Sequence, residues 1–178
     1  YENVRLSFSE IGDRAQIYVN DELKGIVYVN DKEYAVTFSA KEGGTLSILC
    51  ENMGRTNFGP KSMRKKGLPG RCLLDTRIHF DWEVYTLPMD NLGKVDFSLS
   101  DSNENSRFYK GKFTVENPLD TFLKTDNFRK GFVVINGFNL GRFWEIGPQK
   151  TLFVPAGILH GGENEIILFE SDGIKGAP

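Results

Sequence analysis

The run Gly131-Phe132-Val133-Val134-Ile135-Asn136-Gly137-Phe138-Asn139-Leu140-Gly141 sets the architecture of this chain, because its pattern occurs twice. Earlier, Ala15-Gln16-Ile17-Tyr18-Val19-Asn20-Asp21-Glu22-Leu23-Lys24-Gly25 is also a strand-like run that ends at an asparagine turn, with a glycine five residues after the asparagine. In each copy a glycine pair, Gly43-Gly44 or Gly161-Gly162, then precedes a second strand-like run, which ends in Glu51 or Glu170. The two glutamates are 119 residues apart, three more than the 116 residues between the two turn asparagines. A repeat this long indicates a duplicated β-module rather than a solenoid, whose repeats are about 20–50 residues long.

The length of the chain and the repeat together predict two domains, residues 1–90 and 91–178, which meet in a turn-rich bridge at residues 88–94. Hydrophobic residues make up 39% of the 178 residues, charged residues 26%, and the formal net charge is −2. This composition is typical of a soluble globular protein and favours no polyanionic partner. No run approaches the roughly 18–20 apolar residues of a membrane span, so a membrane is not expected as a partner either.

Short segments rich in Val, Ile, Phe, Tyr and Thr, bounded by turn residues, predict an all-β protein built from β-sandwiches or jelly rolls. The predicted strands are Val4–Ser9, Gln16–Asn20, Gly25–Val29, Tyr34–Phe38, Leu46–Cys50, Glu83–Leu87, Val95–Leu99, Tyr109–Val115, Phe132–Ile135, Leu152–Val154 and Glu165–Phe169. Residues 52–71 form the longest irregular stretch, and loops of that length usually serve an interface or a function. Asp101–Arg107 is expected to be a mobile tip, and Ser171–Pro178 a frayed end.

The two cysteines, Cys50 and Cys72, provide neither a metal cage nor a disulfide framework. Cys50 aligns with Phe169 of the second copy, which predicts a buried, apolar environment for it. Free, reduced thiols are therefore expected, and they favour a cytoplasmic location, with a single bridge in an oxidising compartment left as the alternative.

Candidate catalytic groups are not convincing. Most aspartates lie in turn-like contexts, and Glu51 and Glu170 end equivalent strands, which favours a shared structural task such as accepting loop amides. His79 and His160 have no Cys, Asp or Glu at a metal-ligand spacing. The chain is therefore predicted to contain no catalytic residue, no metal site and no cofactor.

A basic cluster, Lys61, Arg64, Lys65, Lys66 and Arg71, raises the question of a nucleic-acid partner. The net charge is negative, however, and no aromatic residue interleaves the cluster as a stacking platform for bases. A solvated loop, or a loop that faces an acidic neighbouring domain, is the favoured interpretation, and no nucleic acid is expected.

A carbohydrate site is a more serious hypothesis for residues 136–144, which supply aromatic, amide and guanidinium groups within nine residues. Its candidate ligands are Asn139, Arg142 and Trp144. The simpler interpretation is that the aromatic residues pack around a hairpin and that Asn136 and Gly137 make its turn.

The run from Lys130 to Trp144, followed by Gly147-Pro148-Gln149 and Leu152-Phe153-Val154-Pro155, strongly resembles the C-terminal region of β-galactosidases of glycoside hydrolase family 35. Asp13-Arg14-Ala15-Gln16, Glu51-Asn52-Met53-Gly54-Arg55 with Asn57, Phe58 and Gly59, and Tyr109-Lys110-Gly111 match further segments of that region in the right order. The resemblance implies an all-β chain of two jelly-roll, galactose-binding-like β-sandwich domains. Relative to the family pattern the chain starts one strand late, as an excised fragment would, so the first sandwich is expected to lack its first strand.

The resemblance places the catalytic glutamates in a barrel domain that this sequence does not match. It implies a parent that removes terminal β-linked galactose with retention, and a non-catalytic task for this chain. That task would be to pack against the barrel through residues 52–70, with Arg55 and Asn57 hydrogen-bonding across the interface, and to hold subunits of a homo-oligomer together. Arg55 and Asn57 bracing their own domain, and an autonomous module that binds galactosides weakly, are the alternatives.

Overall fold

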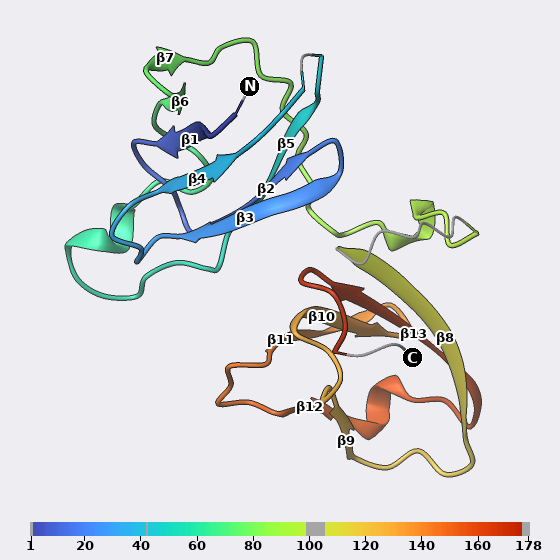
Figure 1. Cartoon of the computed structure of the whole chain (residues 1–178). Coiled ribbons are helices and arrows are strands. Elements are labelled where there is room, and N and C mark those ends of the chain that lie inside the picture. Colours follow the sequence, from blue (N-terminus) through green and yellow to red (C-terminus); the bar gives the residue numbers. More distant parts are fainter. Residues whose placement is uncertain (1, 42, 99–105, 176–178) are drawn as a thin grey trace. The chain divides into compact units, whose positions relative to one another are not determined.

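The computed structural model describes residues 2–41, 43–98 and 106–175 and divides into two compact units, Tyr1–Leu87 and Pro88–Pro178 (Figure 1). Both units are built from antiparallel strands with short 3-10 turns, which confirms the all-β prediction. Among the described residues, no helix is long and apolar enough to span a membrane.

The first unit is a sandwich of two sheets. One sheet has the order β4-β1-β6-β7 and the other has the order β3-β2-β5. The strands are β1 (Val4–Phe8), β2 (Arg14–Val19), β3 (Glu22–Tyr28), β4 (Ala35–Phe38), β5 (Leu46–Glu51), β6 (Cys72–Leu74) and β7 (Arg77–Ile78), and the 3-10 helix η1 spans Pro60–Met63. Alternate residues of both sheets, such as Leu6 and Phe8 of β1 and Ala15 and Ile17 of β2, meet in one buried core.

The second unit packs a four-stranded sheet, in the order β11-β10-β13-β8, with the two-stranded sheet β12-β9. Its strands are β8 (Arg107–Val115), β9 (Thr121–Lys124), β10 (Lys130–Ile135), β11 (Phe138–Trp144), β12 (Thr151–Val154) and β13 (Gly162–Glu170), and its 3-10 helices are η2 (Leu92–Lys94) and η3 (Ala156–Ile158). Val133 of β10, Phe143 of β11 and Leu152 of β12 are among the buried residues of its core.

The repeated hairpin is confirmed in register as well as in sequence. β2 pairs with β3 and β10 pairs with β11, with Ile17 opposite Gly25 and Val133 opposite Gly141, and a β-bulge follows Ile17 in one copy and Val133 in the other. The turn residues Asn20 and Asp21 have φ of 50° and 64°, and Asn136 and Gly137 have φ of 49° and 80°. These left-handed conformations are the reason for asparagine, aspartate and glycine at the turns.

The second half of the repeat is offset by one residue from the sequence match. Arg14 lies opposite Glu51 in the β2–β5 pair, whereas Gly131 lies opposite Glu170 in the β10–β13 pair. Cys50 therefore corresponds to Glu170 and not to Phe169. The prediction of a buried Cys50 was wrong, because Cys50 is exposed near the end of an edge strand, and Cys72 is the buried thiol; both are free.

Two predicted strands are also wrong. Glu83–Leu87 and residues 95–98 have no strand partner among the described residues, and Leu99 lies outside them. The frayed end fails for residues 171–175, because the Ser171 side chain donates to the Lys130 carbonyl at 3.0 Å and the Lys175 N–H donates to the Asn127 carbonyl at 2.9 Å. Of the predicted tip Asp101–Arg107, residues 101–105 lie outside the described residues.

Candidate functional site

The loop at residues 52–70 leaves β5 and returns to β6, and it is fastened to the segment Ile11–Asp13. The Gly12 N–H donates to the Gly67 carbonyl at 2.8 Å, and the Arg64 guanidinium donates to the Ile11 carbonyl at 2.9 Å. Glycine is required at position 12, since a Cβ there would lie 2.3 Å from the Lys65 carbonyl oxygen. The loop is therefore held in close backbone contact with the sandwich.

A nearly buried ion pair holds the base of this loop. The Lys66 Nζ lies 2.7 Å from Asp13 Oδ2 and 2.9 Å from Oδ1, and it also donates to the Gly54 carbonyl at 2.5 Å. Asp13 Oδ2 accepts the Met53 N–H at 2.9 Å, and only 8% of Asp13 is exposed. Two members of the basic cluster, Arg64 and Lys66, thus have structural partners, which accounts for part of the cluster without a nucleic acid.

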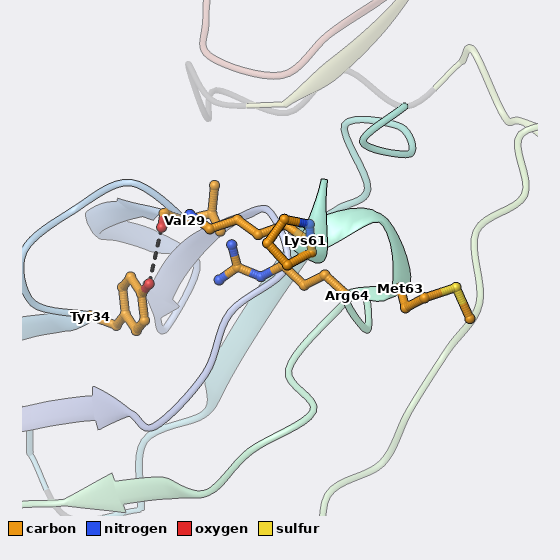
Figure 2. A pocket seen from close by; sticks show the side chains of 6 residues that line it. Val29, Tyr34, Lys61, Met63 and Arg64 are labelled. Atoms are coloured by element: carbon orange, nitrogen blue, oxygen red, sulfur yellow. Dashed lines mark hydrogen bonds between the residues drawn. The ribbon is translucent and has the colours of Figure 1, made fainter. Parts of the chain in front are cut away.

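Two pockets lie against the loop. One, of about 490 Å³, is lined by Val29, Tyr34, Pro60, Lys61, Met63 and Arg64. Figure 2 shows the Arg64 guanidinium directed towards Val29, the Tyr34 hydroxyl donating to the Val29 carbonyl, and Met63 extending away. The other, of about 260 Å³, is lined by Asn52, Gly54, Arg55, Thr56, Lys61, Ser62, Met63, Arg64 and Lys66. The second pocket is cationic, with polar backbone and hydroxyl groups between the charges.

The predicted interface residues Arg55 and Asn57 lie at the surface of this loop. Both are exposed, and neither forms a hydrogen bond with any residue that the structure describes. Phe58 and Met63, on the same loop, are 88% and 83% exposed. Sequence reasoning included both residues in the loop at residues 52–70 but singled out neither as a contact residue. It also did not predict the Asp13–Lys66 pair, although the matched segment containing Asp13 already pointed to that carboxylate. We define residues Arg55, Asn57, Phe58 and Met63 as the docking loop surface.

The predicted carbohydrate residues all lie on β11, and none of them lines either of the two pockets described above. Asn139 Oδ1 accepts the Gly141 N–H at 2.8 Å, so this amide braces the bulge of the hairpin. Arg142 is exposed and lies opposite Phe132, and Trp144 is half-buried opposite Lys130. Alternation along the strand brings Arg142 and Trp144 to the same face, away from the buried Phe143.

Trp144 already has a partner on that face. The Lys130 Nζ lies 4.8 Å from the centroid of the Trp144 ring, and Lys130 is only 4% exposed. The first copy contains the same pair, because Arg14 lies opposite Tyr28 with its guanidinium carbon 5.5 Å from the Tyr28 ring centroid. An aromatic ring over a buried cation is therefore a repeated structural element of the hairpin.

The acids at the strand ends also have structural partners. Glu51 Oε2 accepts from Arg14 at 3.3 Å. Glu170 is fully buried and accepts the backbone N–H groups of Arg129, Lys130 and Asp172 at 2.8, 3.1 and 2.8 Å. Burial raises the pKa of Glu170, although these backbone groups act to lower it. Within the described residues, no group of three or more His, Cys, Asp and Glu side chains could hold a metal ion.

Comparison with known proteins gives the two units an identity. A family model described as β-galactosidase, first all-beta domain, matches residues 1–88, and one described as β-galactosidase, galactose-binding domain, matches residues 106–164. The chain is 34% identical to β-galactosidase 1 of Dictyostelium discoideum over 94% of its own length, 39% to the β-galactosidase-1-like protein of Mus musculus over 94%, and 35% to the β-galactosidase of Bos taurus over 85%. The chain belongs to the β-galactosidase family.

The family assignment confirms the resemblance seen in the sequence and places this chain as a β-galactosidase-related accessory region. It covers 28%, 27% and 26% of the three relatives, so the chain spans about a quarter of the length of the curated relatives it matches. Arg55 and Asn57 fall within the match to the first all-β domain of β-galactosidases, and Asn139, Arg142 and Trp144 within the match to their galactose-binding domain.

Proposed function

We propose that this chain is a non-catalytic accessory region of a β-galactosidase, whose parent polypeptide hydrolyses terminal non-reducing β-D-galactosyl residues in a separate catalytic barrel. One observation carries the proposal: both compact units match β-domains of β-galactosidases, in a chain about a quarter as long as its relatives. The partners of Glu51 and Glu170 support it, because a retaining glycosidase needs two carboxyl groups about 5–5.5 Å apart that are free to face a substrate.

The docking loop surface is our candidate for contact with that barrel. It combines two large exposed apolar side chains, Phe58 and Met63, with Arg55 and Asn57, which form no hydrogen bond within the described residues. Aromatic, methionine and arginine side chains are the types enriched in protein interfaces. The loop that carries this surface is anchored to its own sandwich through Gly12 and Asp13, which reduces the backbone entropy to be lost on docking.

Two experiments test the proposal at different levels. The purified chain should not hydrolyse a chromogenic β-galactoside; turnover that survives further purification and matches the chain's concentration would overturn the non-catalytic role. In the parent enzyme, the double substitution Arg55→Ala and Phe58→Ala should lower the thermal unfolding temperature and kcat/KM. The matched control is Lys32→Ala, which removes an exposed cation of the same unit that has no partner among the described residues.

The same double substitution should leave the unfolding temperature of the isolated chain unchanged, because the surface has no partner there. If the parent's unfolding and kinetics do not respond, the docking assignment fails. If the isolated chain is destabilised as much as the parent, residues 55 and 58 brace their own domain and the assignment fails as well.

A galactoside-binding module is the second candidate, supported by Arg142 and Trp144 on one face of β11 in the region matched by the galactose-binding domain model. Calorimetric titration with galactose and lactose tests it. Millimolar or tighter binding that is lost in Arg142→Ala would establish the module, and Arg142 is the better substitution because it is exposed and does not cover Lys130. Absence of heat at millimolar sugar would eliminate it.

A further inference from the structure

The smaller of the two pockets on the loop at residues 52–70 is lined by positive charges. Its volume is about 260 Å³, and its lining consists of Asn52, Gly54, Arg55, Thr56, Lys61, Ser62, Met63, Arg64 and Lys66. Four of these nine residues are cationic and none of the nine is acidic. Because like charges that share one site repel one another, the arrangement gains stability when an anion occupies the pocket.

Two of the four cations have structural partners and two do not. Arg64 and Lys66 are held by the segment Ile11–Asp13, at 2.9 and 2.7 Å, and these contacts fasten the lining of the pocket to the sandwich. The guanidinium group of Arg55 and the ammonium group of Lys61 form no hydrogen bond and no ion pair with any residue that the structure describes. The pocket therefore carries two positive charges that the described chain does not compensate.

The neutral groups of the lining also suit an anion. The hydroxyl groups of Thr56 and Ser62 can donate hydrogen bonds, and neither has a partner within the described part of the chain. One acceptor of the lining is already used, because Asn52 Oδ1 accepts the Gly54 N–H at 2.9 Å. A ligand whose polar atoms are all acceptors therefore matches the groups that remain.

The larger pocket lies directly beside this one and is more apolar. It shares Lys61, Met63 and Arg64 with the cationic pocket, and its other lining residues are Val29, Tyr34 and Pro60 (Figure 2). The Tyr34 hydroxyl already donates to the Val29 carbonyl at 3.0 Å. An anionic group in the cationic pocket would thus have room beside it for the organic group of an ester.

We propose that the cationic pocket binds a dianionic tetrahedral oxyanion, phosphate or sulfate, as the free ion or as a monoester. One dianion compensates both Arg55 and Lys61, whereas a carboxylate compensates only one of them. A phosphate group also offers at least three acceptor oxygens to the guanidinium, ammonium and hydroxyl donors. The inference goes beyond the proposed function and does not rest on it, because the site is built from residues of the first unit alone.

Titration of the isolated chain with sodium phosphate and sodium sulfate at constant ionic strength, followed by NMR of the backbone amides, tests the site. Saturable shifts should appear at Thr56 and Ser62 with a Kd of about 1 mM or tighter, and the amides of the second unit should not move. Arg55→Ala and Lys61→Ala should each weaken binding at least about tenfold, because each removes a charge-assisted hydrogen bond. Lys32→Ala is the matched control and should leave the affinity unchanged.

Phenyl phosphate distinguishes an ester from the free ion. Binding at least about tenfold tighter than that of inorganic phosphate, with shifts that extend to the amides of Val29 and Tyr34, would assign the site to a monoester whose organic group occupies the apolar pocket. Equal affinity of the two ligands would assign it to the free ion. Either source requires that Lys61→Ala weakens binding.

Three results would overturn the proposal: no saturable shift, an affinity that neither Arg55→Ala nor Lys61→Ala changes, or an equal loss in Lys32→Ala. Sodium acetate that binds as tightly as phosphate would also overturn it, and would assign the pocket to a carboxylate side chain of a neighbouring domain. The docking proposal is tested separately, because Lys61 lies outside the docking loop surface. If Lys61→Ala abolishes oxyanion binding while the parent enzyme does not respond to the substitutions at residues 55 and 58, the docking proposal fails and the oxyanion site stands.

Discussion

The ion pair between Asp13 and Lys66 is predicted to hold the docking loop surface, and its contribution can be measured by a double-mutant cycle. The variants are Asp13→Asn, which keeps the shape of the side chain, Lys66→Met, which keeps its apolar stem, and the two combined. Asp13→Asn removes the negative charge that faces Lys66. It also replaces one of the two carboxylate oxygens, which accept hydrogen bonds from Lys66 Nζ and from the Met53 N–H, with an NH2 group. We expect all three variants to destabilise the first unit.

The magnitude follows from burial. The side chains of Asp13 and Lys66 are 11% and 25% exposed, with 2.7 Å between Oδ2 and Nζ. Fully exposed pairs contribute about 0.2–1 kcal/mol, and breaking a fully buried pair costs about 3–5 kcal/mol. We therefore expect each single substitution to cost about 2–3 kcal/mol, and the coupling energy to be about 1–2 kcal/mol. The double variant should therefore lose about 1–2 kcal/mol less than the sum of the two single losses.

Urea unfolding followed by tryptophan fluorescence measures these energies. The chain has two tryptophans, Trp82 in the first unit and Trp144 in the second. A Trp144→Tyr background leaves Trp82 as the reporter of the first unit and keeps an aromatic ring over Lys130, as Tyr28 covers Arg14 in the other copy. Additive single substitutions, or a coupling energy below about 0.5 kcal/mol, would refute the assignment of the pair as the anchor of the loop.

Three further predictions concern stability. Asn164 is 1% exposed and forms four hydrogen bonds, to the Asn136 amide, to the His160 N–H and carbonyl, and to the Gly162 carbonyl. At about 1 kcal/mol for each bond, Asn164→Ala should destabilise the second unit by about 3–4 kcal/mol in urea unfolding. A loss below about 1 kcal/mol would contradict this. Gly131→Ala should abolish cooperative unfolding of the second unit in calorimetry, because a Cβ there would lie 1.7 Å from the Phe169 carbonyl oxygen. A sharp transition at an unchanged temperature would contradict this, because it would mean that the β13 backbone shifts at little cost in free energy. Burial raises the pKa of Cys72 from 9.0 to about 11, so between these pH values the folded state retains a proton that the unfolded state releases. The free energy of unfolding of the first unit should therefore fall by about 2–3 kcal/mol as pH rises from 9 to 11. Cys72→Ala should remove this pH dependence, and an equal pH dependence in that variant would assign it to other groups.

The sequence predicted the parts of the fold that depend on local chemistry. Asparagine, aspartate and glycine at both hairpin turns are chosen by positive φ, so the repeat could be recognised without coordinates. Four strands were missed, β6, β7, β9 and β11. Of these, β6 and β7 have three and two residues, too few to show alternation. Glu83–Leu87 has the composition of a strand and lacks a described partner, and pairing is a tertiary property that composition does not reveal.

The candidate site was only partly predictable for the same reason. Arg55 and Asn57 were named from a matched motif, and their exposure agrees with a surface role. The Asp13–Lys66 contact joins residues 53 positions apart, and nothing in either local sequence specifies it. The one-residue error in matching Glu51 with Glu170 had a larger effect, because a one-residue shift moves every side chain of a strand to the other face, and it misplaced Cys50.

The two copies also bear on the role of Trp144. Arg14 and Lys130 occupy the same place at the start of the hairpin, each nearly buried and each beneath an aromatic ring from the paired strand, Tyr28 or Trp144. One face of the Trp144 ring is directed to the Lys130 ammonium group, so only the other face could serve as a sugar platform. Because the first copy keeps this pair while carrying Leu23 and Ile26 where the second has Asn139 and Arg142, the pair belongs to the shared fold. Trp144 thus has a partner within the hairpin, and Arg142→Ala is the substitution that tests a galactoside contact on this face without removing that pair.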